Sequence, residues 1–349
     1  MVFQGPNTPH TLDTFPENIL LQNGQVLVRI HLATICGSDL HTYAGKRNTF
    51  LPSVLGHEAV GVVEAVADPG QRHLLGKRIT WTLTDTCGCC KPCTEWNVPQ
   101  KCESLFKYGH APLEDQGGLN GCFATHILLR KGTYIEPLPD TLPDEVVAPA
   151  NCALATMVAV TEPLPPNTHS VLIQGAGLLG IYGATLLKAR GVSHITVTDI
   201  NQERLDFVEK FGFQTLHANH LATKADSSFD AVIEVAGVSN ILSEGIRLLR
   251  PGGHYLWAGM VHDQTPLDIL GVDIVKGCFT VIGVHNYTAT HLSKAIKFLE
   301  KHLHQYPWST LVSPPMPLSN IDAAFALSQQ HMWHRVAVRP THAETTNIT

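Results

Sequence analysis

The chain has 349 residues, 44% of them hydrophobic, which is enough for a sizeable core and predicts about two domains. Lys and Arg total 24 against 30 Asp and Glu, and the net charge of −6 comes without any long basic run. This pattern argues against a nucleic-acid partner. The first residues lack the regions of a signal peptide, and no apolar stretch reaches about 18 residues. We therefore expect a cytoplasmic protein without a membrane partner.

Short strands dominate the first part of the chain. Residues 25–32 alternate apolar and polar side chains, as a half-buried strand does. Further strands are predicted at 59–67, 77–83 and 123–129. Residues 84–121 hold five of the nine cysteines and several glycines, and they are predicted to form a lobe of loops.

Strands alternate with helices from residue 153 onward. An apolar helix is predicted at 153–161, and prolines at 163, 165 and 166 mark a domain boundary after it. The elements expected next are strand 170–174, helix 178–190, strand 194–199, helix 201–211, strand 229–236, helix 239–249, strands 253–258 and 279–285, helix 289–302 and strand 335–338. The alternation predicts an α/β protein with a parallel sheet covered by helices on both faces.

A cluster of cysteines lies inside the predicted loop lobe. Cys87, Cys90 and Cys93 repeat every third residue, and Cys102 follows. Four thiolates complete a tetrahedral shell around zinc and leave no position for water or substrate. We therefore predict a structural zinc site formed by these four residues. Cys89 is expected to point away, although its place between two ligands keeps it as an alternative ligand.

A glycine-rich turn follows the strand at 170–174. Gly175, Gly177 and Gly180 form the pattern G-x-G-x-x-G between this strand and the next helix. In such a turn the glycines allow a tight bend, close approach to a pyrophosphate, and helix–strand packing. Asp199 ends the next strand, where a carboxylate accepts hydrogen bonds from the adenine ribose of NAD and repels a 2′-phosphate. Because no Arg directly follows Asp199, NAD is predicted over NADP.

Three further segments contain residues typical of metal sites. They are Cys36-Gly37-Ser38-Asp39-Leu40-His41, Gly56-His57-Glu58 and Asn151-Cys152-Ala153. With the cysteine cluster and the nucleotide turn, they make the chain resemble a zinc-dependent alcohol dehydrogenase of the medium-chain dehydrogenase/reductase superfamily. The resemblance covers roughly residues 20–340, and the motifs stand in the order of that family.

The resemblance implies a second, catalytic zinc. Cys36, His57 and Cys152 would bind it and leave the fourth position open. Glu58 would be the nearby carboxylate that can enter the shell transiently, and Asp39 would orient His57. Two zinc ions per chain are therefore expected.

The resemblance also assigns the proton path and the nicotinamide contacts. Ser38 would accept the proton of the alcohol and His41 would pass it to solvent. Thr156 and Leu179 would pack against the nicotinamide ring, which takes the hydride. Zinc lowers the pKa of a bound water strongly, and a bound alcohol should respond in the same way.

The implied fold has two parts. A GroES-like, β-rich catalytic domain would span 1–155, with the structural-zinc lobe at 84–121. A Rossmann NAD-binding domain with a doubly wound parallel sheet would span 156–288, and 289–349 would return to the catalytic domain. Relatives form homodimers or homotetramers through the sheet edge at 279–287, and the same is expected of this chain.

Cationic residues after the metal-site segments bear on the choice of substrate. Lys46 and Arg47 follow the relay segment, and Lys107 and His110 follow the zinc lobe. The strings PQKCESLFKYGH and APANCA resemble a subgroup associated with phosphonate catabolism, which implies an anionic substrate held by Lys46 and Arg47. The alternative for these cations is that they are solvated loop charges.

Other functions stay open at this level. The segment at Cys152 resembles dehydrogenases with a Cys ligand more than the polyol branch, where a carboxylate takes that place. A polyol or amino-alcohol dehydrogenase is nevertheless an alternative, and so is an inactive regulatory protein that binds zinc and NAD. The complete set Cys36, His57 and Cys152 argues against the zinc-free quinone reductases and against the inactive protein.

Overall fold

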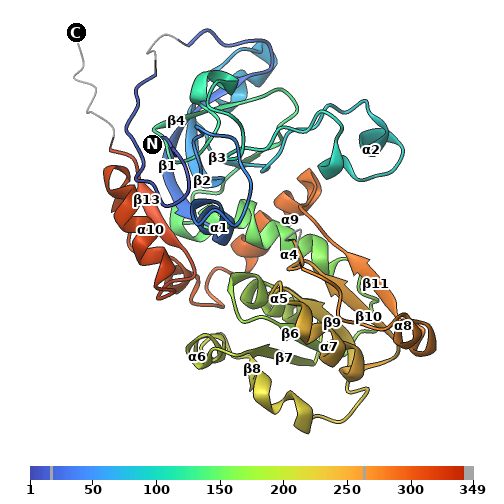
Figure 1. Ribbon diagram of the computed structural model, residues 1–349. Helices are drawn as coiled ribbons and strands as arrows, with labels where there is room; N and C mark the ends of the chain where they lie inside the picture. Colours follow the sequence, from blue (N-terminus) through green and yellow to red (C-terminus); the bar gives the residue numbers. More distant parts are fainter. Residues whose placement is uncertain (16–18, 262–264, 342–349) are drawn as a thin grey trace. The chain divides into compact units, whose positions relative to one another are not determined.

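A computed structural model describes residues 1–15, 19–261 and 265–341 (Figure 1). The chain divides into two compact units. Unit 1 contains Met1–Cys152 and Thr288–Thr349, and unit 2 is the continuous segment Ala153–Tyr287. Among the described residues, no helix has the length and apolar character needed to span a membrane.

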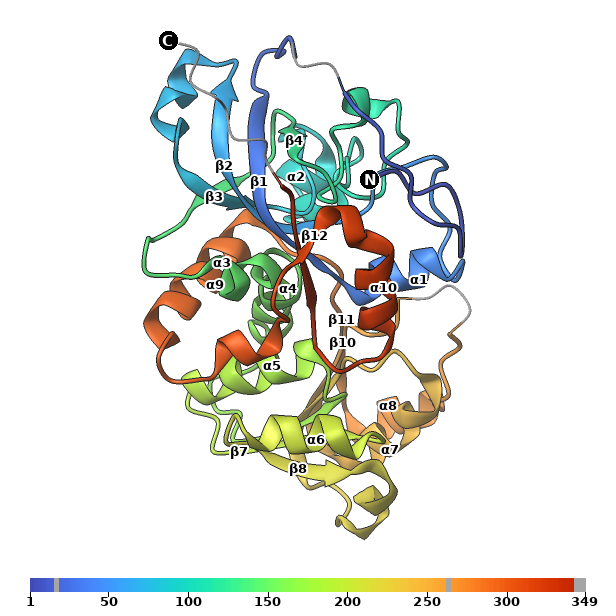
Figure 2. The same cartoon turned by 90° about the vertical axis from the view of Figure 1, so that its left-hand side faces the viewer.

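Unit 1 is built on a mixed, mostly antiparallel sheet. Its elements are β1 (Val26–Ile35), α1 (Gly37–Tyr43), β2 (Glu58–Val66), β3 (Arg78–Trp81), α2 (Lys91–Thr94), β4 (His126–Leu129), β5 (Ile135–Pro137), α3 (Asp144–Val147), α9 (Ala289–His302), β12 (Met316–Pro317), α10 (Ile321–Gln329) and β13 (Val336–Arg339). The sheet runs in the order β12-β13-β1-β2-β3-β5, and β4 also pairs with β1. The last strand of the chain, β13, pairs with β1, and Figure 1 shows the two side by side, while Figure 2 shows β12 in the same region.

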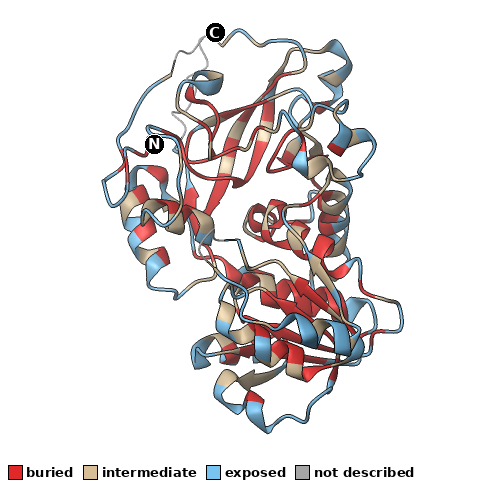
Figure 3. Cartoon of the chain, turned by 45° about the vertical axis from the view of Figure 1, so that its right-hand side comes forward, coloured by how far each residue is buried: buried red, intermediate tan, exposed pale blue. Residues whose placement is uncertain are grey.

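The core of unit 1 includes buried side chains of β1 and β2. The first residues of β1 alternate between buried and half-buried, and its last four are all buried. Val28, Ile30 and Trp81 pack with aromatic residues of the loops, among them Tyr108 and Phe123. Figure 3 shows these strands as mostly buried. This core holds the loops that follow β1 and precede β2 in fixed positions.

Unit 2 is a parallel α/β domain. Its elements are α4 (Ala153–Thr161), β6 (Ser170–Gln174), α5 (Leu178–Ala189), β7 (His194–Asp199), α6 (Gln202–Glu209), β8 (Gln214–His217), β9 (Phe229–Glu234), α7 (Leu242–Leu248), β10 (Leu249–Trp257), α8 (Gly271–Gly277) and β11 (Thr280–Gly283). The described strands form one six-stranded sheet in the order β11-β10-β9-β6-β7-β8. Counted along this unit, the order reads 3-2-1-4-5-6 from the β8 edge, which is the strand order of a Rossmann fold. The predicted doubly wound sheet is confirmed.

Several predicted elements differ from the observed ones. The strand expected at 123–129 begins only at His126, and the helix expected at 239–249 is a short 3₁₀ turn followed by α7. Neither β8 nor α8 was predicted, because β8 is only four residues long and no residue of α8 is buried. The absence of α10 from the prediction has a different reason. Its buried residues Ile321, Ala324, Phe325 and Ser328 follow helical spacing, so the signal was present in the sequence.

The glycine turn of unit 2 has the conformation that its pattern predicts. Gly175 follows β6 with φ of +124°, a left-handed conformation that favours glycine. Gly177 is the N-cap of α5, and a Cβ atom there would meet no atom within 4 Å. A Cβ atom on Gly180 would lie 2.0 Å from the carbonyl oxygen of Gly175. Gly180 therefore serves packing inside the turn, whereas Gly177 leaves space outside it.

Because of this difference, alanine at Gly180 and alanine at Gly177 should change different properties. Gly180→Ala is expected to lower the free energy of unfolding by about 1–3 kcal/mol, because the added methyl group overlaps the backbone. Gly177→Ala is expected to leave the unfolding free energy nearly unchanged and to weaken dinucleotide binding, because its methyl group fills the space beside the helix N-terminus. Chemical denaturation and titration with NADH measure the two effects. Equal loss of stability in both variants would contradict this assignment.

Candidate functional site

The register of β1 brings together residues from distant parts of unit 1. β1 pairs antiparallel with β13 so that Ile35 faces Val336, and continuing this register places Cys36 opposite Arg335. β1 also pairs with β2, and in that register Thr34 faces Glu58. The end of β1 therefore collects a thiol, a guanidinium group and a carboxylate in a small buried space.

Asp39 connects the two loops that carry the first predicted metal ligands. Its carboxylate oxygen Oδ2 accepts a hydrogen bond of 2.8 Å from the backbone N–H of Cys36, and Oδ1 accepts one of 3.3 Å from Gly56. Cys36 is the N-cap residue of α1, and Asp39 stands three residues later in a capping-box arrangement. One buried side chain thus positions the loops of both Cys36 and His57.

The imidazole of His57 is oriented from both of its nitrogen atoms. Nδ1 lies 3.4 Å from Oδ1 of Asp39, and Nε2 lies 3.4 Å from the hydroxyl oxygen of Ser38. Burial opposes a charge on this ring, but Asp39 and the thiol of Cys36 outweigh it and raise the pKa of His57 to about 10. Because Nδ1 faces the carboxylate, Nε2 is the atom available to a metal ion.

Cys152 reaches the same place through a short 3₁₀ helix, Ala148–Asn151. The side-chain amide of Asn151 donates hydrogen bonds to the carbonyl oxygens of His57 (3.0 Å) and Trp81 (3.1 Å). Asn151 is buried, so these bonds hold the end of the 3₁₀ helix against the His57 loop. This positioning role of Asn151 was not predicted.

The donor atoms of Cys36, His57, Glu58 and Cys152 all lie within 4.8 Å of one another. Two thiols, an imidazole and a carboxylate form a donor set that suits zinc. The hydrogen bond with Cys152, followed by the charge of Arg335, lowers the pKa of Cys36 well below its usual range although burial opposes this. These residues fit a bound zinc ion.

Arg335 neutralises this centre, and sequence reasoning did not identify it. Its Nε and Nη2 atoms donate hydrogen bonds of 2.7 and 2.8 Å to the two oxygens of Glu58. Nη2 also lies 3.4 Å from the sulfur of Cys36. The hydroxyl of Thr34 donates a further bond of 2.6 Å to Glu58. Glu58 is therefore held in a bidentate pair, and no local motif near residue 335 indicates this.

The predicted proton path lies on α1. Ser38 is half-buried, and its hydroxyl contacts His57 as described above. His41 is also half-buried and follows Ser38 by three residues, a spacing that puts both on one helix face. The relay role of these two residues stays a prediction.

The predicted substrate cations differ in exposure. Lys46 is exposed, whereas Arg47 is half-buried. Lys107 and His110 lie close to the ligands, and the rings of His110 and His57 are 5.4 Å apart between centroids. Burial, followed by repulsion from Lys107, holds the pKa of His110 well below its usual range.

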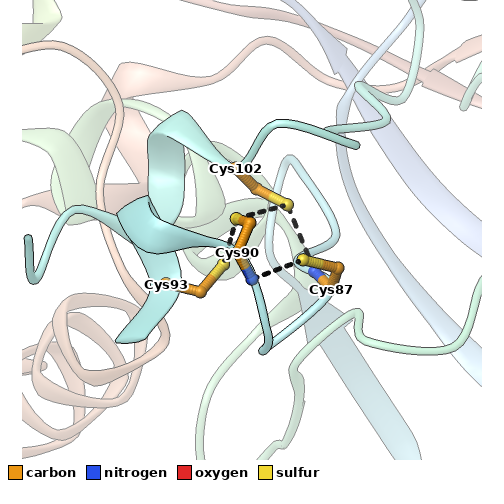
Figure 4. Close-up of side chains that lie close together, drawn as sticks. All are labelled: Cys87, Cys90, Cys93 and Cys102. Carbon is orange, nitrogen blue, oxygen red and sulfur yellow. Dashed lines mark hydrogen bonds between the residues drawn. The ribbon is translucent and has the colours of Figure 1, made fainter. Parts of the chain in front are cut away.

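Four cysteines of the loop lobe converge in a second cluster (Figure 4). The ligand atoms of Cys87, Cys90, Cys93 and Cys102 lie within 4.8 Å of one another, and Cys89 is not among them. The sulfur of Cys90 is 3.4 Å from that of Cys93 and 3.8 Å from that of Cys102. A tetrahedral shell with zinc–sulfur bonds of about 2.3 Å places neighbouring sulfurs roughly 3.8 Å apart.

Backbone N–H groups donate hydrogen bonds to two sulfur atoms of the same cluster. The N–H groups of Cys89 and Cys90 donate to the sulfur of Cys87, and these bonds lower its pKa to about 6. The N–H of Cys87 in turn donates to the sulfur of Cys102 over 3.2 Å. These N–H groups favour the thiolate of Cys87, whereas burial raises the pKa of Cys93 and Cys102 in the absence of a metal ion. The four converging sulfur atoms fit a structural zinc ion.

The nucleotide residues belong to unit 2. Asp199 ends β7, and its Oδ2 accepts a hydrogen bond of 2.8 Å from the backbone N–H of Ala176, inside the glycine turn. Arg204 of α6 lies 3.9 Å from the same oxygen, a neighbour that the sequence prediction did not include. Thr156 on α4 and Leu179 on α5 are each partly exposed.

Removing Arg335 tests the charge balance of the centre. Arg335→Met is expected to lower the free energy of unfolding by about 3–5 kcal/mol, because it leaves the Glu58 carboxylate buried without its partner. Adding Glu58→Gln to this variant should recover much of the loss. Denaturant unfolding of the metal-free proteins measures both effects. A double variant as unstable as the sum of the two single variants would show that the pair is not coupled.

The second cluster is tested by metal content. Cys90→Ser is expected to remove the structural zinc, because three thiolates remain. Cys89→Ser, its neighbour in the chain, should retain that zinc and serves as the matched control. Metal analysis after dialysis measures the difference. Retention of the metal by Cys90→Ser with its loss from Cys89→Ser would reverse the assignment.

Two family models match the chain. The alcohol dehydrogenase GroES-like domain matches residues 22–140, and the zinc-binding dehydrogenase domain matches residues 179–301. The L-threonine 3-dehydrogenase of Legionella pneumophila (strain Corby) is 29% identical over 265 residues, which are 70% of this chain and 72% of the relative. The D-altritol 5-dehydrogenase of Agrobacterium fabrum is 26% identical over 310 residues, 86% and 88% of the two chains.

A solved structure resembles the whole chain. The alcohol dehydrogenase of Thermotoga maritima superposes with a TM-score of 0.88 at 27% identity, and the match covers 98% of both chains. The two matched domains confirm the expected combination of a GroES-like domain with a Rossmann domain. The chain belongs to the medium-chain dehydrogenase/reductase superfamily of zinc-type alcohol and polyol dehydrogenases.

Proposed function

We propose that this protein is a zinc-dependent, NAD-linked dehydrogenase that interconverts an alcohol or polyol and its carbonyl product. The observation that carries the proposal is the convergence of Cys36, His57, Glu58 and Cys152 in one cluster, of which only Cys152 is partly exposed. In this proposal Cys36, His57 and Cys152 hold the catalytic zinc. When bound, the ion acts as a Lewis acid that makes the hydroxyl group of the substrate more acidic.

Glu58 has a defined part in this proposal. Its two oxygens are occupied by Arg335 and Thr34, so it contributes a balanced charge behind the ligands. For Glu58 to join the zinc shell, as the family resemblance implies, its bonds to Arg335 would first have to open. While these bonds are present, Glu58 is not a ligand of the zinc ion. Cys36, His57 and Cys152 are then its three protein ligands.

Ser38 and His41 move the proton in this proposal. The hydroxyl of Ser38 lies 3.4 Å from Nε2 of His57, so it would be near an alcohol bound to the same metal ion. It accepts the substrate proton while its own proton passes outward to His41. His41 is half-buried, so it can exchange this proton with solvent.

The nicotinamide cofactor belongs to unit 2. Gly175, Gly177 and Gly180 would bind the pyrophosphate at the N-terminus of α5, and Asp199 would bind the adenine ribose. Leu179 and Thr156 would contact the nicotinamide ring. Arg204 already neutralises part of the charge of Asp199, yet the carboxylate itself still favours NAD over NADP.

The same proposal includes a structural zinc site, the division into domains, an oligomer and a substrate class. Cys87, Cys90, Cys93 and Cys102 would hold a second, structural zinc. The expected domain at 1–155 would carry catalysis, and that at 156–288 would bind the cofactor. Residues 289–349 would complete the catalytic domain. β11 lies at an edge of the parallel sheet, which supports pairing into a homodimer or homotetramer through this strand. The relatives act on L-threonine and D-altritol, so an amino alcohol or a polyol is a reasonable substrate class.

A single assay series tests the function. The zinc-loaded protein is offered simple alcohols, polyols, amino alcohols, hydroxy acids and phosphonate alcohols with NAD or NADP, and formation of NADH or NADPH is followed by absorbance. We expect oxidation of at least one class, preference for NAD, and two zinc ions per chain. Cys152→Ser should lower the activity by at least roughly 100-fold, because it removes a ligand of the catalytic metal.

An exposed cysteine outside both clusters provides the control. Cys278→Ser alters an exposed cysteine outside both clusters and should retain full activity. One zinc ion per chain together with no turnover of any alcohol would refute the proposed function and favour a regulatory binding protein.

A further inference from the structure

Two cations near the ligand cluster have no acidic partner. Among the described residues, neither Lys107 nor Arg47 has a carboxylate within the 4.0 Å of an ion pair. Both side chains are half-buried, whereas Lys46 beside them in the chain is exposed. A partly desolvated cation is costly unless an anion accompanies it. Most other arginines of this structure do have carboxylate partners, such as Arg78 with Asp144 and Arg130 with Asp85.

The backbone around Lys107 is held firmly. Lys107 forms an isolated β-bridge with Thr84, and the N–H of Tyr108 donates to the carbonyl oxygen of Leu83 over 3.1 Å. Tyr108 is fully buried, and its hydroxyl lies 2.7 Å from that of Thr133. The position of Lys107 is therefore set by the core of unit 1 and not by a mobile loop.

The same segment lies against the loop of a metal ligand. A Cβ atom on Gly109 would come within 2.4 Å of the carbonyl oxygen of Gly56, so only glycine permits this approach. The next residue, His110, packs its ring near that of His57. Lys107 is close enough to the cluster that charges on Cys152 and Cys36 act on its ammonium group.

Burial, followed by repulsion from Arg47, lowers the pKa of Lys107 to about 8, while Cys152 and Cys36 oppose this. The ammonium group therefore still carries its proton at neutral pH. Its depressed pKa is the expected sign of a cation that is enclosed together with another cation and lacks a counterion.

The acidic groups of the centre have contacts of their own. Two thiolates balance a bound zinc ion, and Arg335 balances Glu58. The oxygens of Asp39 are engaged by the N–H groups of Cys36 and Gly56 and face His57. The charge of Asp39 also raises the pKa of Lys107, but none of these acidic groups forms an ion pair with Lys107 or Arg47.

We propose that Lys107, together with Arg47, binds an anionic group of the substrate, a carboxylate or a phosphonate, next to the carbon that is oxidised. This inference rests on the proposed dehydrogenase function and names the substrate class of the same site. It changes the sequence prediction, which paired Arg47 with Lys46. The role of Lys46 stays a prediction, and its exposure implies a smaller contribution.

Three alcohols with one skeleton test the proposal. They are 3-hydroxybutanoate, 2-hydroxypropylphosphonate and the neutral 1,3-butanediol, which share the CH3–CH(OH)–CH2 unit. For the diol, oxidation of the secondary hydroxyl is measured by product analysis. We expect kcat/KM of at least one anion to exceed that of the diol by roughly tenfold or more, since charge-assisted hydrogen bonds form only with the anion. The anion that is preferred identifies carboxylate or phosphonate as the recognised group.

Variants assign the effect to Lys107. Lys107→Met should lower kcat/KM for the preferred anion by roughly 10- to 100-fold, mainly through KM, and leave the diol within about twofold. Lys107→Arg keeps the charge and should retain most of the preference. Lys77→Met removes an exposed lysine of the same unit and should change neither substrate. Unchanged thermal unfolding of the variants shows that they fold.

Binding without turnover separates the two proposals. Calorimetric titration of the zinc-loaded protein with each anion, in the absence of NAD, should show binding that Lys107→Met weakens. Such binding without dehydrogenase activity would support the anion site and refute the proposed function. Equal effects of Lys107→Met on all three alcohols, preference for the diol, or anion binding that does not depend on Lys107 would overturn the anion site.

Discussion

The antiparallel register of β1 determines the chemistry of the centre. Its pairing with β13 places Cys36 opposite Arg335, and its pairing with β2 places Thr34 opposite Glu58. A slip of one residue would turn every side chain to the opposite face of the sheet. The thiol, the guanidinium group and the carboxylate would then no longer meet. The electrostatic balance of the metal centre is thus a consequence of strand pairing, which the buried end of β1 makes specific.

The local parts of the site were predictable from the sequence, because each is a short motif. Cys36 with Asp39, His57 with Glu58, and the glycine turn are contiguous segments whose residue types have a chemical meaning by themselves. Cys152 stands alone, and only its order relative to the other segments indicated its role. The structure brings Cys36, His57, Glu58 and Cys152 into one cluster.

Arg335 was missed for a physical reason, and the sequence named Lys107 without pairing it with Arg47. Arg335 meets Cys36 across 299 residues of chain, and only the sheet register connects them. The role proposed for Lys107 rests on its burial and on the lack of an ion pair among the described residues, and neither property is visible in a string of residues. By contrast, α10 was missed although its buried face follows helical spacing, so that omission came from the interpretation and not from a lack of signal.

The late position of Arg335 affects how the protein matures during synthesis. Glu58 leaves the ribosome 277 residues before its partner, and translation at about 5–20 residues per second separates the two by roughly a quarter of a minute to a minute. During this interval unit 2, which is continuous in sequence, can already fold, whereas the centre of unit 1 still contains an unbalanced carboxylate. Completion of the metal site therefore awaits the C-terminal strand, and a nascent chain can bury Glu58 at low cost only after that strand has joined β1.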